Sequence, residues 1–364
     1  MMTELPRERL NAAKQAFSTR RVPLESIRYV LKVNRIPRAG DVVLARVGEP
    51  GRLERLELTT GRRSRLYPGD EIIVTYGNRY APDAYEALLP THTGPCHLAA
   101  AGGLAADVIA TNLRFADEDR PPTELLPVGI CADSDGNPIN LSDYALRPPS
   151  FLRPDVTACA VFGSSMNSGK TTTAAGIVRG FTQRGLSVGA AKITGTCAGG
   201  DLWKFRDAGC RQAYDFTDAG MATTYKTPLG RIVSGTQLLI DQLIADGCDV
   251  IVLEIADGIH QQETAALLRD ERLRTRIDHW VFAADNAASI ALAAQETGRI
   301  GLDVRCVSGA VTVSPLALRE ASQLVDIPVM EIEDIETGEH LIPWLRDDVR
   351  TRIGAANVSQ AAVF

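Results

Sequence analysis

The stretch from Gly163 to Thr172 has the composition of a phosphate-binding loop. It reads GSSMNSGKTT, with five residues between its glycines where the common pattern has four. Small residues let successive backbone N–H groups turn toward an anion, and a helix beginning there adds its N-terminal dipole. Lys170 would reach the β- and γ-phosphates, and the Thr171 hydroxyl would complete a Mg²⁺ shell. We therefore predict a nucleotide site made of Gly163, Ser164, Ser165, Met166, Asn167, Ser168, Gly169, Lys170, Thr171 and Thr172.

Apolar strands alternate with amphipathic helices on both sides of this loop, from residue 156 onward. Near-continuous apolar strands between helices predict an α/β fold with a mostly parallel sheet and helices on both faces. Ligands bind such folds at the carboxyl ends of the strands, where the polar clusters of this half lie. We expect a P-loop NTPase domain over residues 151–364. It follows a proline-rich linker (residues 145–155) and a smaller β-rich (α+β) domain over residues 1–150.

The lengthened loop resembles that of dethiobiotin synthetase and its relatives, a branch of the P-loop NTPases. The resemblance covers about residues 156–315 and rests on motifs. MinD-type ATPases of the same group have a lysine just after the first glycine, whereas Ser164 and Ser165 follow Gly163 here. The resemblance implies ATP as the nucleotide. Residues 307–315, where relatives usually read the base, contain neither a guanine-reading motif nor a clear adenine signature.

The same resemblance implies roles for residues that end later strands. Lys192, followed by Thr194-Gly195, looks like the family lysine that holds the reacting substrate group, although it lies closer to Thr-Gly than in the family. Glu254 sits where the family has a glutamate that serves the metal. An ionised glutamate in an apolar strand also needs a cation, and Lys170 and Mg²⁺ are the candidates.

Aspartates complete the predicted site. Asp201 opens a helix, where it would be a metal ligand, a simple N-cap, or both. Asp257 follows the Glu254 strand on a loop. We thus predict catalytic roles for Lys170, Lys192, Glu254 and Asp257, and Mg²⁺ ligation by Thr171, Asp201 and Glu254. The alternative for Lys192 is a lysine that ends a buried strand and simply reaches solvent.

The N-terminal half is basic at its start. Residues 1–66 carry fifteen Lys and Arg against seven Asp and Glu, so this segment favours either a polyanion or the acidic remainder of the chain as its partner. Runs at 38–47 and 67–76 share a Gly-Asp turn followed by β-branched residues, which predicts two strands of a small barrel or sandwich. Two helices are expected at Arg7–Ser18 and Leu24–Val33, with a helix-turn-helix as a minor alternative.

Composition excludes several classes of protein. No apolar run approaches the ~18 residues of a membrane span, and charges occupy the place of a signal-peptide core. The seven cysteines form no C-x-x-C pair, so we expect buried thiols and no zinc or disulfide framework. These features predict a cytoplasmic protein that does not bind membranes.

Together these observations predict a Mg²⁺- and ATP-dependent kinase or ligase that activates a carboxylate or carbamate-like group of a small molecule. A homo-oligomer is expected. One alternative is a nucleotide-switch ATPase acting on a protein partner. Another is a polynucleotide kinase, but the aromatic residues that would stack on bases in the basic segment are few, namely Phe17, Tyr29 and Tyr67.

Overall fold

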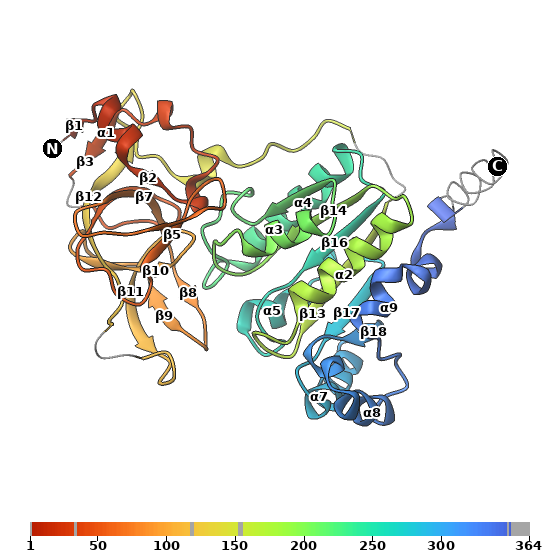
Figure 1. Cartoon of the computed structure of the whole chain (residues 1–364). Coiled ribbons are helices and arrows are strands. Elements are labelled where there is room, and N and C mark those ends of the chain that lie inside the picture. The colour runs from red at the N-terminus through yellow and green to blue at the C-terminus, as the bar shows by residue number, and fades with distance from the viewer. Residues whose placement is uncertain (1, 33–34, 117–119, 152–155, 348, 351–364) are drawn as a thin grey trace. The chain divides into compact units, whose positions relative to one another are not determined.

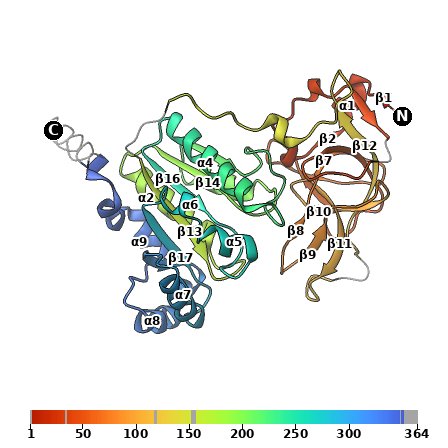
Figure 2. The same ribbon diagram turned by 180° about the vertical axis from the view of Figure 1, so that it is seen from behind.

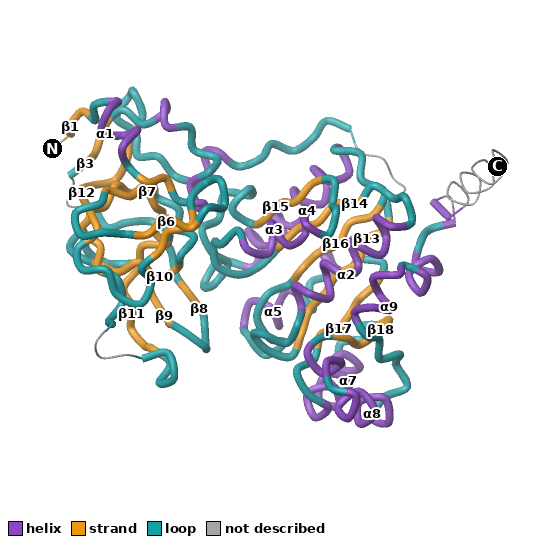
Figure 3. The backbone as a smooth tube through the Cα atoms, viewed as in Figure 1, coloured by secondary structure: helices purple, strands orange, loops and turns teal. Residues whose placement is uncertain are grey.

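The computed structural model describes residues 2–32, 35–116, 120–151, 156–347 and 349–350 (Figure 1). Its contacts divide the chain into two compact units. The barrel unit comprises Met1–Leu146, Gly195–Gly200 and Phe216–Thr227, and the sheet unit comprises the rest. Figure 3 shows mostly strands in the barrel unit and alternating strands and helices in the sheet unit. Residues 152–155 of the predicted linker lie outside the described residues.

The sheet unit is built on six strands in the order β15-β14-β16-β13-β17-β18, and every neighbouring pair is parallel. All positions of β13, β16 and β17 are buried, as their uninterrupted apolar sequences predict. The bounds are β13 Thr157–Gly163, β14 Val188–Lys192, β15 Gln212–Asp215, β16 Val250–Glu254, β17 His279–Ala283 and β18 Val304–Ser308.

Helices cover both faces of this sheet, so the predicted α/β class is confirmed. Helix α2 packs on β13, β14, β16 and β17, whereas α4 packs on β14, β15 and β16. Seen from opposite sides, α2 lies in front of the sheet in Figure 1 and α4 lies in front of it in Figure 2. The helices are α2 Lys170–Gln183, α3 Gly200–Asp207, α4 Leu229–Ala245, α5 Gln262–Leu267, α6 Glu271–Arg274, α7 Ala287–Arg299, α8 Pro315–Leu324 and α9 Ile332–Thr337.

His279 makes the stability of the sheet unit depend on pH. Its Nε2 lies 2.6 Å from the Trp344 carbonyl oxygen and its Nδ1 accepts from Arg305 Nε at 3.3 Å, an arrangement that suits the neutral ring. Burial lowers the pKa of His279 below its ordinary value of 6.5. The unfolded chain therefore binds this proton more readily, and the free energy of unfolding falls as pH drops through 6.5.

We expect His279→Asn to lose less stability than the wild type between about pH 7.5 and about pH 5.5. Denaturant unfolding followed by tryptophan fluorescence measures this, because Trp203, Trp280 and Trp344 all belong to the sheet unit. Equal losses in the two proteins would contradict the assignment.

The barrel unit contains a closed ring of strands. β12 pairs with β4, β4 with β7, β7 with β11, β11 with β10, and β10 again with β12. The two strands predicted from the Gly-Asp runs are confirmed as β4 and β7. The unit's strands are β1 Met2–Glu4, β2 Lys14–Gln15, β3 Tyr29–Leu31, β4 Val42–Val47, β5 Arg55–Glu57, β6 Arg63–Arg65, β7 Glu71–Tyr76, β8 Arg79–Tyr80, β9 Tyr85–Leu88, β10 Cys96–Ala100, β11 Leu104–Thr111 and β12 Glu124–Ala132.

Both faces of β4 are buried from Val42 to Ala45, which explains the run of apolar residues at its start. Val43 and Ala45 join one hydrophobic cluster with residues of β7, β10, β11 and β12, and Val42 and Leu44 join another. Because successive side chains of a strand point to opposite faces, one strand can serve two cores.

The predicted N-terminal helices are largely wrong. The first is only Arg7–Ala12 (α1), and the chain then forms β2 and a 3₁₀ turn. The second is a 3₁₀ turn at Leu24–Ser26 followed by β3, which pairs with β1 and β12; Val33 lies outside the described residues. Backbone pairing with distant strands overrides the local helical pattern here. Among the helices of the described residues, none is long and apolar enough to cross a bilayer.

Candidate nucleotide site

The glycine-rich loop joins the end of β13 to the start of α2. Gly169 precedes the helix with φ 96°, and Asn167 has φ 65°, so the loop turns through left-handed conformations. A Cβ on Gly163 would lie 2.4 Å from Ser168 Oγ and 2.7 Å from the Ala283 carbonyl oxygen, closer than real contacts allow. The first glycine of the lengthened motif is therefore required by packing. The structure thus shows the strand, glycine-rich loop and helix that the sequence motif predicts.

Lys170 spans the loop. It is 6% exposed, and its ammonium group donates to the Ser165 carbonyl oxygen at 2.5 Å. Burial lowers the pKa of Lys170, and the carboxyl groups of Glu254 and Asp257 partly offset that effect. The ammonium thus lies where the loop would enclose phosphate oxygens.

Asp285 supports the same loop from the next strand, just after β17. Its carboxylate accepts hydrogen bonds from Ser164 Oγ at 2.9 Å and from Ser165 Oγ at 3.3 Å. These bonds hold the two serines that stand where a MinD-type loop has its lysine. Asp285 was not among the residues assigned to the site from the sequence, because the contact joins residues about 120 positions apart in the chain.

Two further glycines, which sequence reasoning missed, pack against the loop. A Cβ on Gly309 would lie 2.3 Å from the Ser168 carbonyl oxygen, and one on Gly258 would lie 2.4 Å from that of Ser164. The backbone N–H of Ala310 also donates to the Ser168 carbonyl oxygen at 2.9 Å. Nothing in the local sequence marks these two glycines, because each lies more than 90 residues after the loop serine that it packs against.

The acidic side of the site is assembled by strand register. Lys192 and Glu254 are paired positions at the ends of β14 and β16. Thr171 Oγ1 lies 3.0 Å from Glu254 Oε1 and 3.1 Å from Asp201 Oδ1. Lys192 forms an ion pair with Asp201. The structure thus brings together all the residues predicted to bind metal, and Lys192 faces this cluster with a side chain only 13% exposed.

Burial controls the protonation of these groups. It raises the pKa of Glu254 to about 7, with the Asp201 charge adding to the effect, and raises that of Asp257 to about 6. Burial alone would lower the pKa of Lys192, but Asp201 and Glu254 outweigh it and hold that pKa above its ordinary value. Lys192 therefore stays charged, while two carboxyl groups titrate near neutrality.

The donor set fits Mg²⁺. Glu254 Oε2 is buried and makes no hydrogen bond, so one hard oxygen is left available beside the Thr171 hydroxyl. Within the described residues no group of three or more His, Cys, Asp or Glu is placed to hold a metal by itself. Mg²⁺ commonly takes one or two carboxylates and leaves its other positions to phosphates and water, and Asp201 and Glu254 can supply such carboxylates.

The other predicted site residues differ in exposure. Asn167 and Thr172 are exposed, Met166 is half-buried, and Lys204 donates to Thr172 Oγ1 at 2.9 Å. Asp257 is buried with a left-handed backbone, φ 66°. Such a conformation is unfavourable for a residue other than glycine and is often found at functional sites.

Comparison with solved structures finds many similar chains, and three of them, each at low identity, serve as examples. They are the signal recognition particle receptor FtsY from Elizabethkingia anophelis (13% identity, 56% of this chain and 74% of that chain, TM-score 0.36), the signal recognition particle 54 kDa protein from Aeropyrum pernix K1 in complex with GDP (14%, 61% and 54%, 0.38) and the cell division protein ftsY from Thermotoga maritima (16%, 55% and 74%, 0.36). No family model and no curated protein matches the sequence.

Proposed function

We propose that the sheet unit binds a nucleoside triphosphate with Mg²⁺ and transfers its γ-phosphoryl group to an oxygen nucleophile. The observation that carries this proposal is the buried cluster beside the glycine-rich loop, in which Lys170 and Lys192 face Asp201, Glu254 and Asp257. Two ammonium groups against three carboxyl groups leave a negative excess. A divalent cation would make the cluster net positive, as anionic phosphates require.

Different residues would bind the phosphates, the metal and the acceptor. Backbone N–H groups of the loop and the Lys170 ammonium bind the phosphates, and the Lys170 contact with Ser165 is exchanged for phosphate oxygen. Thr171, Asp201 and Glu254 would hold the metal, which supplies charge neutralisation on the phosphate oxygens. Lys192, anchored by Asp201, faces the acceptor oxygen.

Asp257 is the candidate proton acceptor. Its raised pKa of about 6 keeps it ionised at neutral pH yet basic enough to take a proton. A bond forms between the acceptor oxygen and the γ-phosphorus, the bond to the β-phosphate oxygen breaks, and the nucleoside diphosphate leaves. Any proton on the acceptor passes to the Asp257 carboxylate. A carboxylate or carbamate acceptor carries no proton, and its phosphorylation would not need this base.

The course of the chain favours a nucleotide switch as a second candidate. Between Thr194 and Asp201 the chain leaves the sheet unit, because Gly195–Gly200 belong to the barrel unit. Lys192 and Asp201, which flank this segment, are joined by their ion pair. A nucleotide that alters the ion pair would move the ends of a barrel-unit segment, which is the coupling that a switch acting on a protein partner needs.

Nucleotide turnover tests both candidates. We expect purified protein with Mg²⁺ to bind and turn over ATP in preference to GTP, faster when metabolite extract supplies an acceptor. Lys170→Gln should weaken nucleotide binding at least about tenfold and abolish turnover, because it removes the cation within the loop. The matched control is Lys226→Gln, at an exposed lysine outside the sheet unit.

The outcomes separate the two functions. Binding with negligible turnover that extract does not change would overturn the phosphoryl-transfer enzyme in favour of the switch. Absence of nucleotide binding by the wild type, measured by calorimetry, would overturn both.

A further inference from the structure

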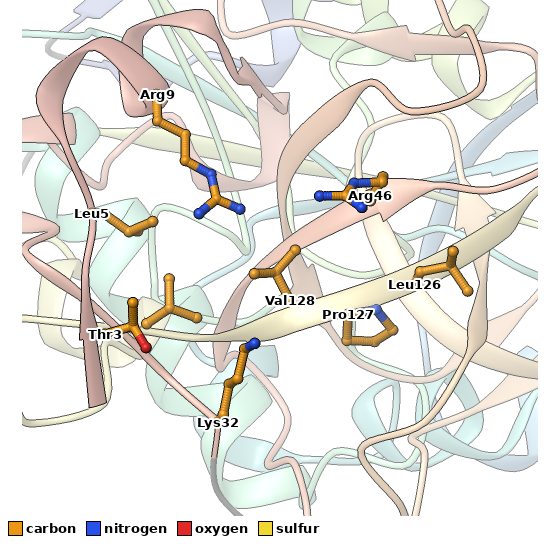
Figure 4. Close-up of a pocket in the computed structure, with 9 residues that line it drawn as sticks. Thr3, Leu5, Arg9, Lys32, Arg46, Leu126, Pro127 and Val128 are labelled. Carbon is orange, nitrogen blue, oxygen red and sulfur yellow. The ribbon is translucent and has the colours of Figure 1, made fainter. Parts of the chain in front are cut away.

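The barrel unit has an open pocket of about 290 Å³ whose lining is cationic. Three basic side chains from separate elements reach it: Arg9 of α1, Arg46 of β4 and Lys32, which directly follows β3. Figure 4 shows the guanidinium groups of Arg9 and Arg46 pointing toward one another, with the Lys32 side chain entering from the opposite side. None of the residues that line the pocket is acidic.

A single carboxylate behind the pocket holds both arginines. Arg9 donates to the two carboxylate oxygens of Glu71 at 2.8 and 2.7 Å, and Arg46 Nη2 lies 3.5 Å from Glu71 Oε1. The hydrogen bond to Glu71 raises the pKa of Arg9, so its charge is retained. The two guanidinium groups thus share one negative charge, which leaves a positive excess that an anion would neutralise.

Apart from Thr3, the remaining lining is apolar. Leu126 and Val128 of β12 and Val30 of β3 line the pocket. β12 lies between β3 and β4, yet Leu126 is 37% exposed. The pairing of β12 with β4 shifts register between Pro127 and Gly129, and such a bulge re-aims the side chains around it. Leu126 of this interior strand is thus exposed at the pocket, whereas Val128 both lines the pocket and packs against a core cluster.

We propose that this pocket binds a small organic anion, with its carboxylate or phosphate held by Arg9, Arg46 and Lys32 and a short hydrocarbon part on Leu126 and Val128. Arginine suits both headgroups, since its planar fork binds two oxygens at once. The volume lies at the lower end of the ~300–1,000 Å³ typical of ligand pockets, which limits the ligand to a small molecule. All these residues belong to the barrel unit, so this site is separate from the nucleotide site.

Calorimetric titration of the full chain with simple probes tests the proposal. Octanoate and octyl phosphate carry the two headgroups, 1-octanol carries the hydrocarbon without charge, and inorganic phosphate carries the charge without hydrocarbon. We expect octanoate or octyl phosphate to bind, and the better of the two identifies the headgroup. The double variant Lys32→Gln/Arg46→Gln should bind it at least about tenfold more weakly, because two of the three cations are lost.

Two controls locate the binding. Arg63→Gln changes an exposed arginine of β6 outside the pocket and should leave the affinity unchanged. Lys170→Gln disables the nucleotide site and should also leave it unchanged, so this test does not depend on the proposed function. The proposal is overturned if neither amphiphile binds, if 1-octanol binds as tightly as the anions, if the double variant binds like the wild type, or if Lys170→Gln abolishes binding.

Discussion

Glu254→Gln is expected to lower the rate of nucleotide turnover by about 100- to 1,000-fold. The substitution keeps the shape of a side chain that is 2% exposed and keeps an oxygen that can accept from Thr171. It removes the carboxylate charge and the buried oxygen, Oε2, that makes no hydrogen bond. Steady-state turnover at several Mg²⁺ concentrations should show both the lower maximum rate and a higher Mg²⁺ requirement, because one of the proposed ligands is weakened.

The same variant should not lose stability. Burial raises the pKa of Glu254 to about 7, which means that the folded protein disfavours its charged form. A neutral amide avoids that penalty, so we expect the free energy of unfolding at about pH 8 to be unchanged or higher. Lower activity together with retained stability distinguishes a functional glutamate from a structural one. Wild-type turnover, or a loss of activity matched by unfolding, would contradict the role assigned to Glu254.

Gly309→Ala is expected to disrupt the nucleotide site from a position 140 residues beyond Gly169 in the chain. Gly309 has φ 100°, and an added Cβ would lie 2.3 Å from the Ser168 carbonyl oxygen and 2.9 Å from the Ala284 backbone nitrogen. Both atoms belong to the backbone, so the clash cannot be relieved by a change of side-chain rotamer. We expect a loss of at least about 2 kcal/mol in the free energy of unfolding and at least about tenfold weaker nucleotide binding.

Gly298→Ala is the matched control. Gly298 lies inside α7, and an added Cβ there meets nothing within 4 Å. Alanine is the better helix former, so this variant should gain about 0.5–1 kcal/mol and bind nucleotide normally. Tryptophan fluorescence and calorimetry compare the two variants. If Gly309→Ala behaved like Gly298→Ala, the support that Gly309 gives to the loop would be unnecessary.

Features that depend on local chemistry and periodicity could be predicted from the amino-acid sequence. Uninterrupted apolar runs such as β16 predicted a parallel sheet, because both faces of such strands must be covered. The Gly163–Thr172 loop was located because its residue types suit an anion at a helix N-terminus. Lys192 and Glu254 could be placed at strand ends because each follows an apolar run, and their roles were implied by the family resemblance.

Features formed by contacts between segments far apart in the sequence could be seen only in the tertiary structure. The segment Leu24–Val33 looked helical, yet its described part contains β3, since hydrogen bonds to β1 and β12 outweigh a small local preference. The support of the loop by Asp285 and Gly309 arises where separate strands end at one edge of the sheet. The cationic pocket gathers Arg9, Lys32 and Arg46 from three separate elements. No local pattern records such encounters, because the fold as a whole sets the distances between side chains remote in sequence.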